Sequence, residues 1–224
     1  MQPGFYSKFG YDMLETHEKL GLNTVYQWGV CTGRSMLETT RYMKQAGIRM
    51  DKHFGFDTFE GMPEETAEEV DQESWRKGGL NASEFLGVST VEECVAKIYT
   101  ELVAVDSKPQ YYLIPGLAEE TINDENNKKY GFTPALIIDA DFDIYSPTKF
   151  ALDYFIKNKI IVEGTFIYYD DWGGVKGWEE MKKGEARAHK EICDEYSIEF
   201  NFLGQIGNSF PHVQRLYQVT KVNL

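Results

Sequence analysis

Two clusters of acidic side chains each follow a short apolar segment of this chain. Asp139, Asp141 and Asp143 come after residues 134–138, and Asp170 and Asp171 come after residues 165–169. Both apolar segments are rich in β-branched and aromatic residues, which is typical of buried parallel strands. Carboxylates that meet beyond the carboxyl ends of such strands repel one another unless a cation or protons neutralise them. Because carboxylate oxygens are ligands of hard divalent ions such as Mg²⁺, the pattern predicts a metal-bearing active site.

The elements that must position these acids alternate between strand and helix almost throughout the chain. This alternation predicts an α/β fold, a doubly wound and mostly parallel sheet wrapped by helices. We expect parallel strands at residues 24–29, 53–57, 111–115, 134–140 and 165–169. We expect helices at residues 6–20, 35–45, 90–103, after Ser146-Pro147 and at 179–196. The chain closes with two further strands, 199–203 and 213–219, which are expected to form an antiparallel pair.

Residues 60–89 form the longest stretch without clear periodicity, and they are polar and contain several glycines. A long irregular connection inside a compact domain is usually functional, so we expect a lid or insertion there. The sequence has no internal repeat and no low-complexity linker. We therefore expect one domain over residues 1–224.

Composition excludes several classes of partner. The net charge is -13 without a basic stripe, which argues against non-specific nucleic-acid binding. No apolar run approaches the length of about 20 residues that spans a membrane, and the first residues do not resemble a signal peptide. The expectation is a cytoplasmic protein without a membrane or nucleic-acid partner, and assembly into a homo-oligomer stays open. The three cysteines lie far apart and have neither zinc nor disulfide spacing.

A glycine turn follows the first expected strand and leads into a helix. Its spacing, Gly29-x-x-x-Gly33 before Ser35, is not that of a dinucleotide-binding or P-loop motif. A simple tight turn would explain it equally well. Asp57, followed by Thr58, ends the second strand, where an acid can accept hydrogen bonds from ribose hydroxyls, although a turn aspartate is the alternative. Together these features favour a nucleoside-containing cofactor without a pyrophosphate.

Four segments occur together in a familiar order. They are residues 29–35 (GVCTGRS), 56–63 (FDTFEGMP), 141–148 (DFDIYSPT) and 166–172 (FIYYDDW). In these segments the chain resembles the macrocin O-methyltransferase (TylF-like) family, over roughly residues 22–200. The resemblance implies a class I, Rossmann-like methyltransferase fold that uses S-adenosylmethionine, with a seven-stranded sheet whose last strand is antiparallel.

The resemblance also implies a role for each matched residue. Three aspartates would hold Mg²⁺ and a fourth would be the general base, while other residues would lie along the cofactor. The implied ligands are Asp141, Asp170 and Asp171, the base is Asp143, and the cofactor-binding residues are Gln27, Gly29, Gly33, Ser35, Asp57 and Thr58.

Two positions depart from the family pattern. Gln27 stands where the family usually carries an acidic residue, so it can hydrogen-bond the methionine ammonium but supplies no countercharge. Asp139 stands at a position that the family usually fills differently. Asp139-Ala-Asp141 is also a D-x-D, but Tyr145 and Thr148 favour the register in which Asp141 and Asp143 form the motif.

The function implied is metal-dependent methyl transfer to a hydroxyl of a small sugar-like or natural-product acceptor. A metal-dependent nucleotide-sugar glycosyltransferase is the main alternative, because it also places a D-x-D after a buried strand. A non-catalytic protein with a methyltransferase fold is the other alternative, for which Gln27 is the motive. His189 lies on a charged helix, and we expect it on the solvated surface.

Overall fold

The computed structural model describes residues 3–70, 73–173, 181–207 and 213–222. Seven strands form one sheet in the order β3-β2-β1-β4-β5-β7-β6. Their bounds are β1 Thr24–Trp28, β2 Lys52–Asp57, β3 Gln110–Pro115, β4 Ala135–Ala140, β5 Phe166–Gly173, β6 Glu199–Ile206 and β7 Val213–Lys221. β1 to β5 are mutually parallel, and β7 runs antiparallel to both of its neighbours. The predicted fold class is confirmed, including the antiparallel last strand.

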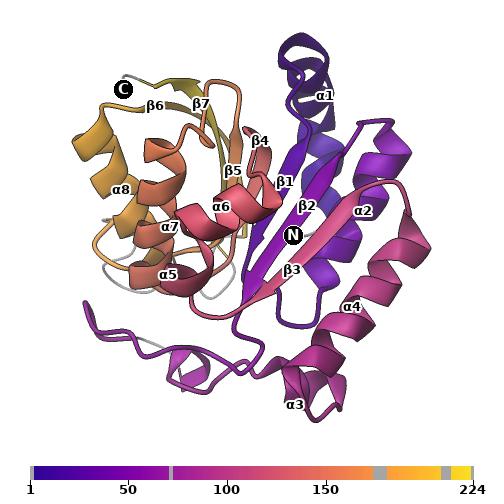
Figure 1. Cartoon of the computed structure of the whole chain (residues 1–224). Helices are drawn as coiled ribbons and strands as arrows, with labels where there is room; N and C mark the ends of the chain where they lie inside the picture. The colour runs from indigo at the N-terminus through magenta and orange to yellow at the C-terminus, as the bar shows by residue number, and fades with distance from the viewer. Residues whose placement is uncertain (1–2, 71–72, 174–180, 208–212, 223–224) are drawn as a thin grey trace.

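Helices cover both faces of the sheet (Figure 1). One face carries α1 Pro3–Leu20, α2 Arg34–Ala46 and α4 Val91–Val105. The other carries α5 Ala118–Thr121, α6 Asp124–Tyr130, α7 Tyr145–Lys157 and α8 Gly184–Tyr196. A 3₁₀ turn, Glu73–Trp75, and the short helix α3 Ala82–Leu86 lie in the connection between β2 and α4. Among the described helices, none is long and apolar enough to cross a membrane.

Burial on both faces explains the apolar strand sequences. In β1, Tyr26 and Trp28 contact Phe155 of α7, with ring centroids 4.8 and 5.1 Å apart. Val25, which points to the opposite face, belongs to the core under α1, α2 and α4. Neither face of a central strand therefore meets solvent, which favours continuous apolar runs over alternation.

The structure differs from the sequence-based expectations at four elements, which are α5, α6, β5 and α8. The helices α5 and α6 were not predicted, because they are short and α6 has no buried residue to give an apolar stripe. β5 continues to Gly173, so Asp170 and Asp171 lie within this strand rather than after it. α8 begins at Gly184, and its predicted start at residue 179 lies outside the described residues.

Candidate active site

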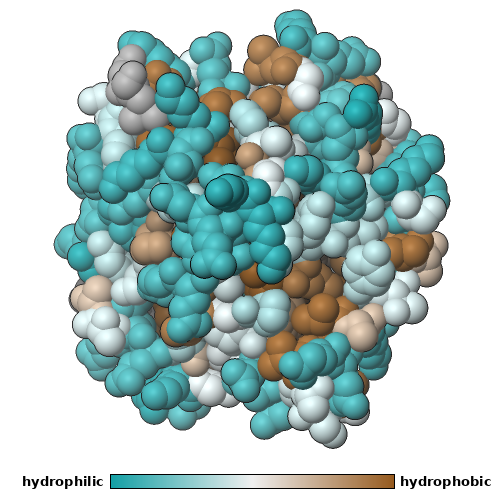
Figure 2. All heavy atoms as spheres, in the orientation of Figure 1, coloured by the Kyte–Doolittle hydropathy of each residue, from teal (hydrophilic) through white to brown (hydrophobic). Residues whose placement is uncertain are grey.

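A cavity of about 630 Å³ opens at the carboxyl ends of the parallel strands. Gly29 after β1, Asp57 and Thr58 at the end of β2, and Asp141 and Asp143 after β4 line it. β1 and β4 are neighbours at the point where the strand order reverses, and this is where ligands bind in open α/β sheets. Figure 2 shows apolar residues gathered in the lower centre of the visible face, near the ends of β2 and β3, with hydrophilic residues around them.

The two glycines of the turn after β1 have different roles. Gly29 has φ 77, and a Cβ on it would lie 1.8 Å from the Asp141 carbonyl oxygen. Gly33 has φ 78, and a Cβ there would lie 2.6 Å from Ile98 of α4. Gly29 thus lets the β1 turn approach the end of β4 at the cavity. Gly33 instead lets the start of α2 pack against α4, and it does not line the cavity.

Asp57 links this turn to the end of β2 through hydrogen bonds. Its Oδ2 accepts hydrogen bonds from the backbone N–H groups of Val30 and Cys31, both at 2.7 Å. Its Oδ1 accepts one from the N–H of Phe59 at 2.6 Å. Asp57 therefore has the structural role of a turn aspartate and also lines the cavity, beside Thr58.

Gln27 and Asp139, the two departures from the family pattern, are partners in the register of β1 and β4. Both side chains are fully buried. The Nε2 of Gln27 donates to the Gly29 carbonyl at 2.9 Å. Within the described part of the chain, Oε1 of Gln27 and both carboxyl oxygens of Asp139 have no hydrogen-bond partner. Burial, with the charge of Asp170 nearby, raises the pKa of Asp139 to about 7. Neither residue lines the cavity, and nor does Ser35.

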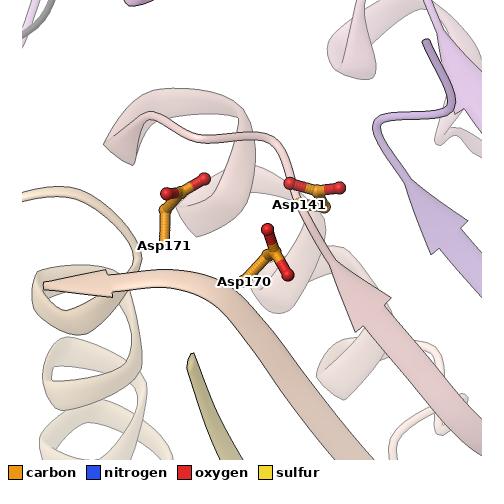
Figure 3. Close-up of side chains that lie close together, drawn as sticks. All are labelled: Asp141, Asp170 and Asp171. Carbon is orange, nitrogen blue, oxygen red and sulfur yellow. The ribbon is translucent and has the colours of Figure 1, made fainter. Parts of the chain in front are cut away.

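Asp141, Asp170 and Asp171 converge beside the cavity. One carboxylate oxygen from each lies within 4.8 Å of those from the other two (Figure 3). Asp141 follows β4, whereas the other two are consecutive residues of β5. Consecutive residues of a regular strand point to opposite faces, so this convergence requires an irregular strand.

β5 has that irregularity. Tyr169 pairs with Arg215 and Gly173 with Val213, so three residues of β5 lie opposite the single residue Gln214 of β7. The ring of Trp172 accordingly packs against Tyr169, with centroids 5.2 Å apart. In a regular strand these two side chains would lie on opposite faces. The bulge re-aims both aspartates toward Asp141, a common use of bulges next to active sites.

The electrostatics of this cluster favour a cation. Burial, and then the charges of neighbouring carboxylates, raise the pKa of Asp141 and of Asp171 well above the ordinary value. No lysine or arginine of the described residues forms an ion pair with Asp141, Asp170 or Asp171. Three converging carboxylate oxygens without a basic partner fit a hard divalent ion such as Mg²⁺.

Asp143 lies next to this cluster in a strained turn. Its φ is 62, and the N–H of Ile144 donates to the carbonyl of Phe142 at 2.6 Å, which closes a γ-turn around it. Such turns with positive φ are rare, and backbone strain of this kind concentrates at functional sites. Burial and the charge of Asp170 raise the pKa of Asp143 to about 7, although hydrogen bonds from Asp171 and the Trp75 indole oppose the rise.

Trp75 belongs to the connection after β2, which borders the cavity through Met62 and Leu80. Two glutamates link this connection to the N-termini of α7 and α8, which cover one face of the sheet. Glu65 accepts from the N–H and the Oγ of Ser146 in α7, at 2.8 and 2.6 Å. Glu68 accepts from the N–H of Gly184 in α8 at 2.7 Å. Carboxylates at helix N-termini satisfy free N–H groups and favour the helix dipole.

The structure thus brings the four aspartates of the implied metal and base set together. Of the six implied cofactor residues it places Gly29, Asp57 and Thr58 at the cavity, and it places Gln27, Gly33 and Ser35 away from its lining. Two residues near the site had no predicted contact with the aspartates, although Trp75 was expected in the lid and Glu185 fits the family pattern. Trp75 contacts Asp143, and Glu185 is fully buried behind Asp171. The sequence signal for Glu185 is its match, together with Gly184, to the family pattern, and this match predicts no particular contact.

The raised pKa values give a pH dependence of stability. Asp139 and Asp143 have pKa values of about 7 in the folded chain, above their ordinary value. The native protein therefore binds these protons more tightly than the unfolded chain, and its free energy of unfolding falls as pH rises through this interval. We expect Tm of the metal-free protein to be lower at about pH 8 than at about pH 5.5 by on the order of 5 °C.

Divalent cations should reverse this loss. Added Mg²⁺ or Mn²⁺ should raise Tm strongly at about pH 8 and little at about pH 5.5, where protons already neutralise the carboxylates. Thermal unfolding with and without the cation, against NaCl of equal ionic strength, measures the effect. If the divalent cation raised Tm at about pH 8 no more than NaCl does, the predicted cation site would be contradicted.

Comparison with known proteins agrees with this geometry. A family model described as macrocin-O-methyltransferase (TylF) matches residues 22–197. The calicheamicin methyltransferase CalS11 superposes with a TM-score of 0.69 at 16% identity, covering 97% of this chain and 80% of that one. The O-methyltransferase NovP gives 0.64 at 15% identity, covering 95% and 79%. A second CalS11 structure, described as a TDP-rhamnose 3'-O-methyltransferase, gives 0.56 at 16% identity, covering 97% and 81%. A search of curated proteins found no match. The structural similarity at these identities shows the fold.

Proposed function

Because the chain belongs to the macrocin O-methyltransferase family, it is an S-adenosylmethionine-dependent O-methyltransferase, and we propose that it methylates a sugar-like or natural-product hydroxyl with the help of a divalent cation. The observation that carries the proposal is the convergence of Asp141, Asp170 and Asp171 beside Asp143, at the cavity that Gly29 and Asp57 line. The description of CalS11 as a rhamnose methyltransferase supports the acceptor class.

The cofactor would lie along the ends of β1 and β2. Gly29 lines the cavity where the methionine part would lie, and Asp57 and Thr58 line it where the ribose would lie. Gln27 and Ser35 do not line the cavity in this structure, so they would support the cofactor site indirectly. Gly33 would support it by letting α2 pack against α4. The methyl group would then point toward the aspartates after β4 and β5.

The acceptor hydroxyl must lose its proton as its oxygen attacks the methyl carbon. Asp143 lines the cavity beside the metal-ligand set and is placed to take this proton. Its pKa of about 7 suits a general base that works near neutral pH. A divalent cation held by Asp141, Asp170 and Asp171 would supply Lewis-acid polarisation of the acceptor hydroxyl.

Water exclusion is assigned to residues 60–89, which we propose as a lid within a single domain of residues 1–224. Apolar side chains of this segment, Met62 and Leu80, line the cavity, and Trp75 is 4% exposed above Asp143. Methyl transfer from a sulfonium to an oxyanion removes both charges, so a water-poor cavity favours it. The bonds from Glu65 and Glu68 hold the segment in place and would have to break for wide opening.

Ligand binding tests the proposal and separates it from the two alternatives. By calorimetry, S-adenosylhomocysteine should bind. A nucleotide sugar incubated with Mn²⁺ should release no free nucleotide, which is the product that a glycosyltransferase would form. Radiolabelled S-adenosylmethionine offered with a panel of nucleotide sugars and glycosides should give a methylated product only without chelator. Absence of S-adenosylhomocysteine binding would overturn the assignment of the cavity. Binding of S-adenosylhomocysteine without methyl transfer to any hydroxylated acceptor would support the non-catalytic alternative. Full activity in excess EDTA would show that methyl transfer needs no divalent cation.

A further inference from the structure

The bulge in β5 leaves a backbone group that the sheet does not satisfy. Residues 170–172 lie opposite Gln214 alone, so the regular ladder of β5 and β7 is interrupted between Tyr169 and Gly173. The N–H of Asp171 instead donates to Oε2 of Glu185 at 3.0 Å. A buried backbone N–H without a partner is unfavourable, so this bond stabilises the bulged form of the strand.

Glu185 is well placed to hold that form rigidly. It is the second residue of α8, whose first N–H, at Gly184, is bound by Glu68 of the connection after β2. The Glu185 side chain is fully buried, and its Oε1 has no hydrogen-bond partner among the described residues. A buried carboxylate with a single backbone bond is costly as a purely structural element, because an apolar side chain could fill the same space.

The bond acts on a residue of the metal-ligand set. A carboxylate oxygen of Asp171 lies within 4.8 Å of carboxylate oxygens of Asp141 and Asp170 (Figure 3). The bulge of the strand at this point makes this approach possible. Partners behind the ligands of a metal site set their orientation, and their loss typically weakens metal binding by about 10–100-fold.

We propose that Glu185 is a positioning residue, which holds the β5 bulge through the N–H of Asp171 and so keeps Asp171 aimed at the cation. The proposal rests on the function proposed above, since it assumes that Asp171 is a ligand. The contact needs the reach and the oxygen of the side chain rather than its charge. Glu185→Gln, which keeps both, is therefore expected to substitute for it, and Glu185→Asp, which is one methylene shorter, is not.

The test measures Mn²⁺ affinity by calorimetry in the wild type, Glu185→Asp, Glu185→Gln and the control Glu195→Asp. Glu195 lies on the exposed side of the same helix. S-adenosylhomocysteine affinity and Tm are measured alongside. We expect Glu185→Asp to weaken Mn²⁺ binding by about 10–100-fold while S-adenosylhomocysteine affinity stays unchanged. Glu185→Gln and Glu195→Asp should bind Mn²⁺ like the wild type.

Each other result contradicts the proposal in a distinct way. Wild-type Mn²⁺ affinity in Glu185→Asp would show that the contact does not position Asp171. An equal loss in Glu185→Gln would show that the carboxylate charge matters, as for a ligand. If the wild type itself binds S-adenosylhomocysteine but no Mn²⁺, the proposed cation site is wrong, and the proposed role of Glu185 is wrong with it. If it binds neither, the cofactor cavity is wrongly assigned.

Discussion

Asp141→Asn is expected to abolish measurable methyl transfer, with a loss in kcat/KM of about 10³-fold or more. The substitution removes one of three carboxylates whose oxygens converge within 4.8 Å, so the remaining pair should bind a divalent cation poorly. The fold should survive, because Asn has nearly the same shape. It should even be more stable without metal at about pH 8, because one of several buried, mutually repelling charges is gone.

Asp139→Asn provides a matched control, since it makes the same chemical change two residues earlier, within the strand β4 that Asp141 follows. We expect Asp139→Asn to keep the Mg²⁺-dependent rise in Tm and Asp141→Asn to lose it. Thermal unfolding with and without Mg²⁺, followed by assay of methyl transfer, measures both. Loss of the Mg²⁺ effect in Asp139→Asn with its retention in Asp141→Asn would show that Asp139-Ala-Asp141 is the functional D-x-D in the other register.

Asp143→Asn is expected to separate chemistry from metal binding. The side chain is proposed to take the proton of the acceptor hydroxyl, and loss of a general base typically lowers kcat by about 10²–10⁴-fold. Mn²⁺ affinity should stay close to that of the wild type. The wild-type kcat should rise with pH through the Asp143 pKa, which is about 7 without the cation and lower with it, because only the deprotonated carboxylate accepts a proton, and this dependence should vanish in the variant.

Stopped assays of kcat over a pH series, together with Mn²⁺ calorimetry, measure this separation. The cation lowers the pKa of nearby carboxylates, so the wild-type rise should move to lower pH as Mg²⁺ is increased. A loss of Mn²⁺ binding in Asp143→Asn as large as that in Asp141→Asn would contradict the division of roles, since both residues would then be ligands.

Much of the site follows from residues that end strands. Asp57 and Asp141 could be placed from the sequence because parallel strands deliver their carboxyl ends to one edge, and the strand assignments needed only short apolar runs. The glycine turn was identified as well, but the two roles within it were not. Only the structure shows that Gly29 faces Asp141 and that Gly33 faces Ile98, because these contacts join segments far apart in the chain.

The convergence of Asp170 and Asp171 could not be derived from local sequence. A bulge is defined by the count of residues on two paired strands, and the partner strand here lies more than 40 residues further along the chain. Glu185 was hidden for the same reason, since its contact with Asp171 depends on that bulge.

His189 is a case in which the sequence-based expectation was wrong. Its neighbours are charged, which favoured a solvated surface position, but the side chain is 5% exposed and packs among Trp172, Phe200 and Tyr217. Burial and the charge of Arg215 lower its pKa to about 3, and its Nδ1 lies 3.1 Å from the hydroxyl of Tyr169. The helix is amphipathic with a narrow inward face, and a histidine on that face cannot be distinguished from an outward one by composition alone.

The proposed activity depends most directly on a divalent cation held by Asp141, Asp170 and Asp171 beside the cofactor. The decisive measurement is a crystal structure with S-adenosylhomocysteine and Mn²⁺, with anomalous scattering recorded to locate the metal. We predict a single strong anomalous peak about 2.1 Å from an oxygen of each of the three aspartates, with Asp143 close by but not coordinated. Bound S-adenosylhomocysteine with no anomalous peak at these residues, or a peak coordinated elsewhere, would contradict the account.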